Sequence, residues 1–264
     1  MTAAPPLREV LAALVPDGEA WTIDAPAGWG QGRTLYGGMT AALCWAAAVR
    51  ALPDLPPLRS AQFAFIGPAA GRLLLTPRLL RRGRSAAVVE VVAMGEAGEA
   101  ARAIFTCGAP RVSAVTHDRA PAPKVCAPLD GINMFPPDGL GPSFSKRFEV
   151  RGAGGGFPYG GGDPDLLAWA RLREAAGCDP VAAMLAIGDV LAPAAMVVFP
   201  TPGVISTMNW SLDIDRIPED AAGWTLISSS SETAADGYSR QAMQAWGEDG
   251  RRLWAGRQTV AVFV

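Results

Sequence analysis

The chain has 264 residues, of which 50% are hydrophobic and 18% charged, and its formal net charge at pH 7 is −2. This length predicts one large domain, or two of about 130 residues each, with a sizeable core. The low charge excludes the basic surface of a nucleic-acid-binding protein and the composition of a disordered acidic tail, so a small molecule or another subunit is the expected partner.

The cysteines and the N-terminus indicate a cytoplasmic protein. Cys44, Cys107, Cys126 and Cys178 form no C-x-x-C pair, which favours free thiols in a reducing compartment. The first ten residues contain no basic stretch followed by an apolar run, so no secretory signal is expected. Prolines interrupt the uncharged run of residues 190–212, which is therefore not expected to span a membrane.

The first half of the chain predicts one α+β unit. Its expected elements are a helix over residues 7–15, strands over 20–25 and 32–36, a helix over 39–52 that Gly37-Gly38 opens, and four strands between 60 and 108. The second helix, MTAALCWAAAVRAL, is apolar on nearly every face and must be buried all round. This order predicts an antiparallel sheet wrapped around a central helix.

Residues 109–143 predict a connector between two units. Residues 110–142 contain seven prolines and little periodicity, which is typical of an extended strap across the surface. The predicted organisation is a first unit over residues 1–108, the connector, and a second unit over residues 144–264.

The second half repeats the first. Two strands surround a glycine-rich segment, GAGGGFPYGGGD, and Asp179-Pro180 then starts a second apolar helix, VAAMLAIGDV. Four strands close the chain. The last hairpins of the two halves, MGEAGEAARAIFTCG and WGEDGRRLWAGRQTV, share a Gly-Glu-x-Gly turn, which indicates an internal duplication at an offset of roughly 145 to 150 residues.

Three polar residues stand in apolar surroundings in the second half. Asp189 is the one formally charged residue in 181–212, and burying a carboxylate costs several kcal/mol unless hydrogen-bond donors replace its water. Thr207 lies in a strand-like run and Gln258 interrupts the last strand. Each also has a plain structural interpretation, since an Asp at a helix end is often a turn or a cap.

Overlaying the halves suggests that the three residues serve function rather than fold. Aligning the last hairpins puts Thr106 opposite Gln258, and aligning the strands after the helices puts Ala61 or Gln62 opposite Thr207. The first central helix contains no acid. We therefore expect a duplicated fold that does without these polar groups in its first half.

The order and spacing of these segments resemble the type II acyl-CoA thioesterases, over essentially the whole chain. The matching segments are LYGGMTAALCWAA, FSKRFEVR, LLAWARLR, IGDVLAPAAM, STMNWSLDIDR and GRQTV. The resemblance implies a double hotdog fold and a hydrolytic water held at the positions of Asp189, Thr207 and Gln258. The strand after Thr207, MNWSLDID, departs from the more histidine-rich and aromatic sequence of typical members, so no acyl-chain preference is implied.

The chemistry also stands without the resemblance. A thioester carbonyl is electrophilic enough for attack by a positioned water, with Asp189 as general base and no cofactor. Thr207 and Gln258 are expected to orient the water and the carboxylate. Backbone N–H groups at Gly38 and Met39, at the start of the first central helix, are the expected oxyanion donors. A tight strand-to-helix turn explains the glycines there equally well. The acyl chain is expected between the two central helices.

Other reaction types lack their residues. The single histidine, His117, lies in the connector and no G-x-S-x-G occurs, which argues against a serine hydrolase and a hotdog dehydratase. No nucleotide-binding motif or metal-ligand cluster is present. The competing hypothesis is a non-catalytic acyl-CoA or lipid-binding protein on the same fold.

Two further expectations concern partners. Four arginines either contact the phosphates of coenzyme A or are ordinary charges at exposed strand ends; they are Arg78, Arg81, Arg82 and Arg84. Exposed strand edges often pair, so a homodimer is expected.

Overall fold

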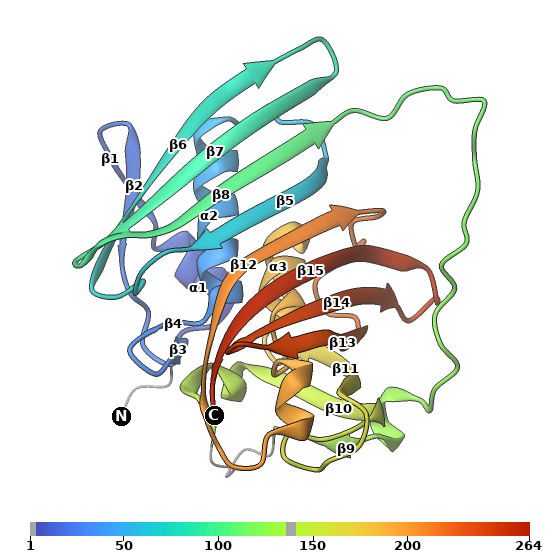
Figure 1. Cartoon of the computed structure of the whole chain (residues 1–264). Helices are drawn as coiled ribbons and strands as arrows, with labels where there is room; N and C mark the ends of the chain where they lie inside the picture. Colours follow the sequence, from blue (N-terminus) through green and yellow to red (C-terminus); the bar gives the residue numbers. More distant parts are fainter. Residues whose placement is uncertain (1–3, 136–140) are drawn as a thin grey trace.

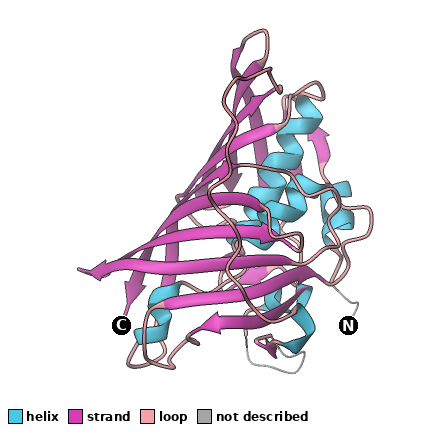
Figure 2. Ribbon diagram, turned by 90° about the vertical axis from the view of Figure 1, so that its right-hand side faces the viewer, coloured by secondary structure: helices cyan, strands magenta, loops and turns pink. Residues whose placement is uncertain are grey.

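The structure is a computed structural model that describes residues 4–135 and 141–264. Within these residues, a 13-stranded antiparallel sheet has the order β1-β2-β6-β7-β8-β5-β12-β15-β14-β13-β11-β10-β9. Two central helices, α2 (Gly37–Ala51) and α3 (Pro180–Gly188), lie behind the sheet in Figure 1 and to its right in Figure 2.

The remaining elements are short helices and strands. The first half has α1 (Leu7–Ala12), β1 (Val15–Asp17), β2 (Ala20–Asp24), β3 (Gly30–Gln31), β4 (Thr34–Leu35), β5 (Leu58–Phe65), β6 (Arg72–Arg82), β7 (Ala86–Gly95) and β8 (Gly98–Gly108). The rest has η1 (Pro128–Asp130), β9 (Ile132–Asn133), η2 (Ser143–Arg147), β10 (Phe148–Gly155), β11 (Asp165–Leu172), η3 (Ala194–Val198), β12 (Val204–Ile214), β13 (Thr225–Ala235), β14 (Tyr238–Gly247) and β15 (Arg252–Phe263). None of the helices described is long and apolar enough to cross a membrane.

Both central helices are buried because their sequences offer no polar face. Residues 38–48 of α2 and residues 181–188 of α3 are all buried. The two helices pack against each other, and the small alanine side chains of α2 allow a close approach. Helix α3 starts where the Asp179 carboxylate accepts a hydrogen bond of 2.8 Å from the Ala182 N–H.

The two halves of the sheet repeat around its central strand pair. Strand β5 pairs with β12, so that Ala61 lies opposite Leu212 and Phe63 opposite Trp210. The order then runs β5-β8-β7-β6 on one side and β12-β15-β14-β13 on the other. This arrangement, with one buried helix for each half, confirms the predicted double hotdog fold of the α+β class.

The first predicted helix is shorter than expected. It ends at Ala12, and Val15–Asp17 forms β1 instead. Strand β1 pairs with β2 across a turn in which Gly18 has φ +61°. Proline removes the backbone donor that a helix needs, and the following Asp-Gly pair favours a hairpin turn.

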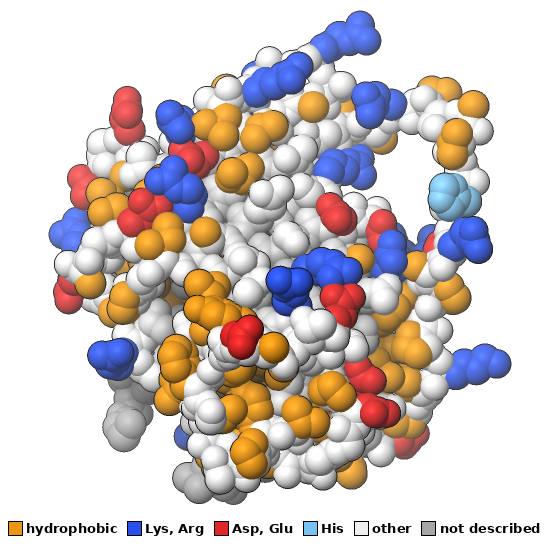
Figure 3. Space-filling view, in the orientation of Figure 1, with side chains coloured by type: hydrophobic (Ala, Val, Ile, Leu, Met, Phe, Trp, Pro, Cys, Tyr) orange, Lys and Arg blue, Asp and Glu red, His pale blue; other side chains and the backbone are white. Residues whose placement is uncertain are grey.

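The connector predicted over residues 109–143 is largely exposed and is fixed to the second half by two tryptophans. The Trp246 indole donates to the Ala120 carbonyl at 2.9 Å, and that of Trp169 donates to the Cys126 carbonyl at 3.0 Å. The connector also contains η1 and the short strand β9, which its proline content did not predict. Part of it stands away from the body in Figure 3, and residues 136–140 lie outside the described residues.

Strand pairing corrects the expected overlay at the last strand. Gln258 pairs with Gln241, and the equivalent pair of the first half, counted from the preceding hairpin, is Phe105 with Val89. The counterpart of Gln258 is therefore Phe105 and not Thr106. The overlay is displaced because the turn between β14 and β15 is one residue longer than the turn between β7 and β8.

The same comparison corrects the counterpart of Thr207. Thr207 pairs with Val260 immediately before a one-residue bulge in β12. Leu58 occupies the same position before the matching bulge in β5. Its counterpart is therefore Leu58, not Ala61 or Gln62, because the segment between helix and strand is longer in the second half and only the strand register aligns the two strands.

Candidate active site

The predicted base, Asp189, lies at the C-terminus of α3 and is hydrogen-bonded to the predicted Gln258. The Gln258 carboxamide Nε2 donates to Asp189 Oδ1 at 2.6 Å. The backbone N–H of Gly38, at the start of α2, lies beside the carboxylate and lowers its pKa. Residues far apart in sequence, from both halves of the chain, thus meet at one acid.

The environment of Asp189 changes its protonation. Burial raises the pKa of its carboxyl from the ordinary 3.8 to about 7, and the hydrogen bonds from Gln258 and the Gly38 amide oppose this rise. A carboxyl with a pKa near neutrality can accept a proton and release it again at physiological pH. This is the property that a general base needs.

Two glycines allow α2 to begin against this carboxylate. A Cβ on Gly37 would lie 2.6 Å from Asp189 Oδ2, and one on Gly38 would lie 2.7 Å from the Ala186 carbonyl oxygen. Neither glycine has a positive φ, so close approach and not backbone conformation requires them. The first backbone bond of α2 runs from the Thr40 N–H to the Tyr36 carbonyl at 3.1 Å. The amides before Thr40 therefore precede the helical ladder and can serve a ligand.

Thr207 lies near this pair without bonding to it. It pairs with Val260, two residues from Gln258, and therefore faces the same side of the sheet. The bulge after Thr207 turns its side chain to the face that also carries the buried Trp210. The Thr207 hydroxyl makes none of the hydrogen bonds found among the described side chains, so it is free to bind a water or a substrate atom.

Sequence reasoning missed a second buried glutamine, Gln241. Its Nε2 donates to Gln258 Oε1 at 3.3 Å. Its Oε1 accepts from the Ser229 hydroxyl at 3.2 Å and from the Ala194 N–H. A correct overlay would have revealed it, because the first half has Val89 at the equivalent position.

Tyr36 supports the approach of the two helices. Its hydroxyl donates to the Ala186 carbonyl at 2.9 Å, and its ring stacks on Phe144 with centroids 4.0 Å apart. Burial, with the nearby negative charge of Asp189, raises the Tyr36 pKa well above its ordinary value. The phenol therefore stays protonated and acts as a donor.

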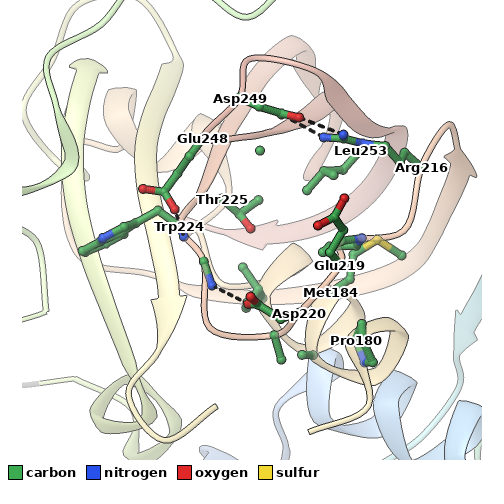
Figure 4. A pocket seen from close by; sticks show the side chains of 16 residues that line it. Pro180, Met184, Arg216, Glu219, Asp220, Trp224, Thr225, Glu248, Asp249 and Leu253 are labelled. Atoms are coloured by element: carbon green, nitrogen blue, oxygen red, sulfur yellow. Dashed lines mark hydrogen bonds and ion pairs between the residues drawn. The ribbon is translucent and has the colours of Figure 1, made fainter. Parts of the chain in front are cut away.

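A separate pocket of about 280 Å³ runs along α3 (Figure 4). Pro180 and Met184 form part of its lining, and Arg216 points toward Asp249 with an N–O distance of 2.8 Å. None of the predicted site residues lines it. Its rim also carries acidic side chains, so we do not assign the phosphates of a carrier to this pocket.

The described residues support no metal centre. Within residues 4–135 and 141–264, no group of three or more His, Cys, Asp or Glu side chains could hold a metal ion. His117 is exposed on the connector. The groups around the Asp189 carboxylate are the Gln258 carboxamide, with Gln241 behind it, and the backbone at the start of α2.

Two family models match the chain. One, described as the acyl-CoA thioesterase N-terminal domain, matches residues 25–108. The other, described as the acyl-CoA thioesterase C-terminal domain, matches residues 113–262. No curated protein sequence matches the chain significantly.

Solved structures share the fold. A conserved protein of unknown function with a hot dog fold from Alicyclobacillus acidocaldarius is 23% identical, with a TM-score of 0.87 and 97% of each chain covered. An acyl-CoA thioesterase II from Mycobacterium marinum is 17% identical, with a TM-score of 0.77, over 97% of this chain and 98% of its own. The dehydratase domain of RzxB from Pseudomonas fluorescens is 13% identical, with a TM-score of 0.51, over 98% of this chain and 100% of its own. A fold shared by different enzymes does not assign the reaction, which has to come from the site.

Proposed function

Because the chain belongs to the acyl-CoA thioesterase family, we propose that it hydrolyses an acyl-CoA thioester to a free acid and coenzyme A, with Asp189 as the general base. The observation that carries this proposal is the environment of the partly buried Asp189 carboxyl. Its pKa is raised to about 7, it accepts a hydrogen bond from Gln258, and it lies beside the start of α2. A carboxylate in a binding protein has no need of such an environment.

In the proposed reaction, a water lies between the Asp189 carboxylate and the thioester carbonyl carbon. Asp189 takes one proton as the water oxygen forms its bond to that carbon. The carbonyl π electrons move to the oxygen, which gives a tetrahedral oxyanion. When the carbonyl re-forms, the C–S bond breaks, the thiolate leaves with its electron pair, and the proton held by Asp189 passes to sulfur. No atom is left on the protein, so no covalent intermediate is needed.

The start of α2 would stabilise the oxyanion. The N–H groups at Gly38 and Met39 belong to the first turn, where the helix dipole favours negative charge. The Gly38 amide lies beside Asp189 and lowers its pKa, which would place the oxyanion site next to the base, while Met39 supplies the next amide along the turn. Both residues remain proposed substrate contacts.

Thr207 and Gln258 would orient the reactants. Gln258 holds one carboxylate oxygen at 2.6 Å, which leaves the other to face the water. The Thr207 hydroxyl, on the same face of the sheet, would accept or donate a hydrogen bond to that water. The acyl chain was expected between α2 and α3, but these helices pack directly against each other, so the chain would have to lie against their apolar surfaces instead.

The four arginines receive no substrate role in this proposal. Arg78 forms an ion pair with Glu90, and Arg82 forms one with Asp54. These pairs support the interpretation of ordinary surface charges, with Arg82 at the end of β6 and Arg78 within it. Coenzyme A as the carrier therefore rests on the family and not on an arginine cluster.

A panel of acyl-CoA substrates tests the proposal. Purified protein should release free thiol from at least one saturated, branched or aromatic acyl-CoA, at a rate that saturates with substrate. Equilibrium binding of the same compounds is measured in parallel. Tight binding without thiol release across the panel would favour the non-catalytic acyl-CoA or lipid-binding protein instead.

A further inference from the structure

We infer that Gln241 is a positioning residue for this reaction, because it fixes the orientation of the Gln258 carboxamide so that its NH2 group faces Asp189. The inference rests on the proposed function and adds to it a residue that touches neither the acid nor the substrate. A continuous chain of hydrogen bonds runs from the Ala194 backbone amide through Gln241 and Gln258 to Asp189.

A carboxamide can be turned by 180° with little change of shape, and the turn exchanges a donor for an acceptor. For Gln258, one end meets Asp189 Oδ1 at 2.6 Å and the other meets Gln241 at 3.3 Å. Its NH2 group bonds the carboxylate well, whereas its oxygen would repel it. Two partners therefore act on the orientation of this carboxamide, the Asp189 carboxylate at one end and the Gln241 side chain at the other.

The orientation of Gln241 is itself fixed. Its Oε1 lies against the backbone N–H of Ala194, which can only donate, and within 3.2 Å of the Ser229 hydroxyl. Oε1 must therefore point to these donors, and Nε2 must point to Gln258 Oε1. A backbone amide thus sets the direction of every bond from Ala194 through Gln241 and Gln258 to Asp189.

The same bonds close a loop around the base. Ala194 lies in η3, which follows Asp189 after a short segment. Gln258 ties one end of this segment to β15, and Gln241 ties the other to β14. The position of the carboxylate is therefore held relative to two neighbouring strands of the sheet.

Burial makes a purely structural role a poor explanation. Gln241 is 1% exposed and Ser229 is 2% exposed, and buried amides and hydroxyls cost stability unless every group is satisfied. In the first half, Val89 and Phe105 occupy the positions of Gln241 and Gln258. The fold therefore needs no amide at either place.

The first experiment compares Gln241→Met with the wild type. Methionine has a similar length but removes the donor to Gln258, so the Gln258 carboxamide can present its oxygen to Asp189 and favour the protonated acid. We expect the acid limb of kcat/KM to move to higher pH by at least about half a unit, with roughly tenfold lower kcat at neutral pH. Gln244→Met, on the same strand but on its other face, is the matched control and should leave the profile unchanged.

The same shift can be measured without turnover. The ¹³C carboxyl resonance of Asp189, assigned through Asp189→Asn, reports its titration directly. The other groups around this carboxyl are the Gly38 amide and Tyr36 from the start of α2, Gln258 from β15 and the apolar Phe65 of β5. Tyr36 stays protonated, so the titration near neutrality belongs to Asp189.

A double-mutant cycle separates positioning from packing. In a Gln258→Met background, Gln241→Met should shift the Asp189 titration no further, because Gln241 acts through Gln258. An unchanged Asp189 titration in Gln241→Met, or an equal shift in both backgrounds, would overturn the inference. If Gln241→Met does not fold, Gln241→Asn, whose amide is too short to reach Gln258, replaces it under the same criteria. If the wild type releases no thiol, the proposed function fails while the resonance titration still decides the role of Gln241.

Discussion

The two halves of the chain place different groups at one repeated position. In the second half, Asp189 at the end of α3 bonds Gln258 at 2.6 Å. In the first half, Trp45 of α2 contacts Phe105, the counterpart of Gln258, with ring centroids 5.3 Å apart. Both Asp189 and Trp45 also reach the start of the other half's central helix. Asp189 lies beside Gly38 of α2, and the Trp45 indole donates to Asp179 at the start of α3 at 3.0 Å. An aromatic pair in one half thus takes the place of an acid–amide pair in the other.

The starts of α2 and α3 also differ between the two halves. The first turn of α3 is capped by the side chain of Asp179, which accepts from the Ala182 N–H. The first turn of α2 follows Tyr36, which provides no side-chain cap. The Gly38 amide of this turn lies beside Asp189, the acid of the other half. The first half therefore forms the fold with apolar groups at this position, which supports the proposal that the polar groups of the second half serve chemistry.

Removing the charge of Asp189 should have the largest effect on activity. Asp189→Asn keeps the shape and can still accept the Gln258 hydrogen bond, but it cannot take a proton. We expect thiol release to fall by about 10²–10⁴ with the fold intact, as for loss of a general base. Steady-state kinetics and circular dichroism measure the two effects.

The control for Asp189→Asn is Asp179→Asn. It removes the charge of the carboxylate at the start of α3, at the other end of the same helix, and should leave turnover largely unchanged. If Asp189→Asn keeps most of its activity, Asp189 is not the base. If both variants lose activity equally, the two halves do not differ in function as proposed.

Gly37→Ala should have the next largest effect. Its Cβ would lie 2.6 Å from Asp189 Oδ2 and 3.3 Å from the Phe65 ring, so either the carboxylate or the start of α2 must move. We expect roughly 10²-fold lower kcat/KM, because small displacements of reacting groups are costly, and a loss of about 1–3 kcal/mol in stability. Gly83→Ala, whose Cβ would lie 3.6 Å from its nearest neighbour, should change neither quantity. Wild-type kinetics in Gly37→Ala would mean that the contact with Asp189 is unimportant.

The sequence predicted the acid but not its surroundings. Asp189 could be identified because a single charge in a long apolar run must have partners, and Gln258 because it interrupts an apolar strand. Gln241 was missed because β14 carries polar side chains on both faces, so alternation does not identify the buried one. Thr106 was paired with Gln258 because a turn longer by one residue is visible only in the strand register. The order of helices and strands was predictable from periodicity, whereas the contact between α2 and the end of α3 depends on packing between distant segments.

The effect of pH on kcat/KM should be smaller within one pH unit of neutrality, and it should report on Asp189 of the second half. The base acts in its deprotonated form, and burial raises the pKa of Asp189 to about 7. We therefore expect kcat/KM to fall about tenfold for each pH unit below 7 and to level off above it. A profile that stays flat down to pH 5 would contradict the assignment of Asp189.

Stability should depend on pH in the opposite sense. A folded-state pKa above the unfolded value of about 3.9 means that the fold favours the neutral acid. This contribution is present in full below pH 4 and is lost as the pH rises through 7. Asp189→Asn should therefore raise Tm relative to the wild type at pH 8 and have little effect at pH 4, as measured by thermal unfolding at both values.

Thr207→Val should give the smallest loss of activity. It tests whether the two halves also differ in function at the position of Thr207 and Leu58. Valine keeps the β-branched shape suited to β12, and the counterpart Leu58 is apolar in the first half, so the strand does not need the hydroxyl. We expect an unchanged Tm and a kcat lower by about tenfold, the effect of one hydrogen bond to the attacking water. Thr259→Val, on the neighbouring strand and the opposite face, should leave kcat unchanged. Equal activity of Thr207→Val and the wild type would mean that the polar half uses Asp189 and the glutamines alone. In that case the bulge would only bring Thr207 to the core side of the sheet, as the matching bulge does for Leu58.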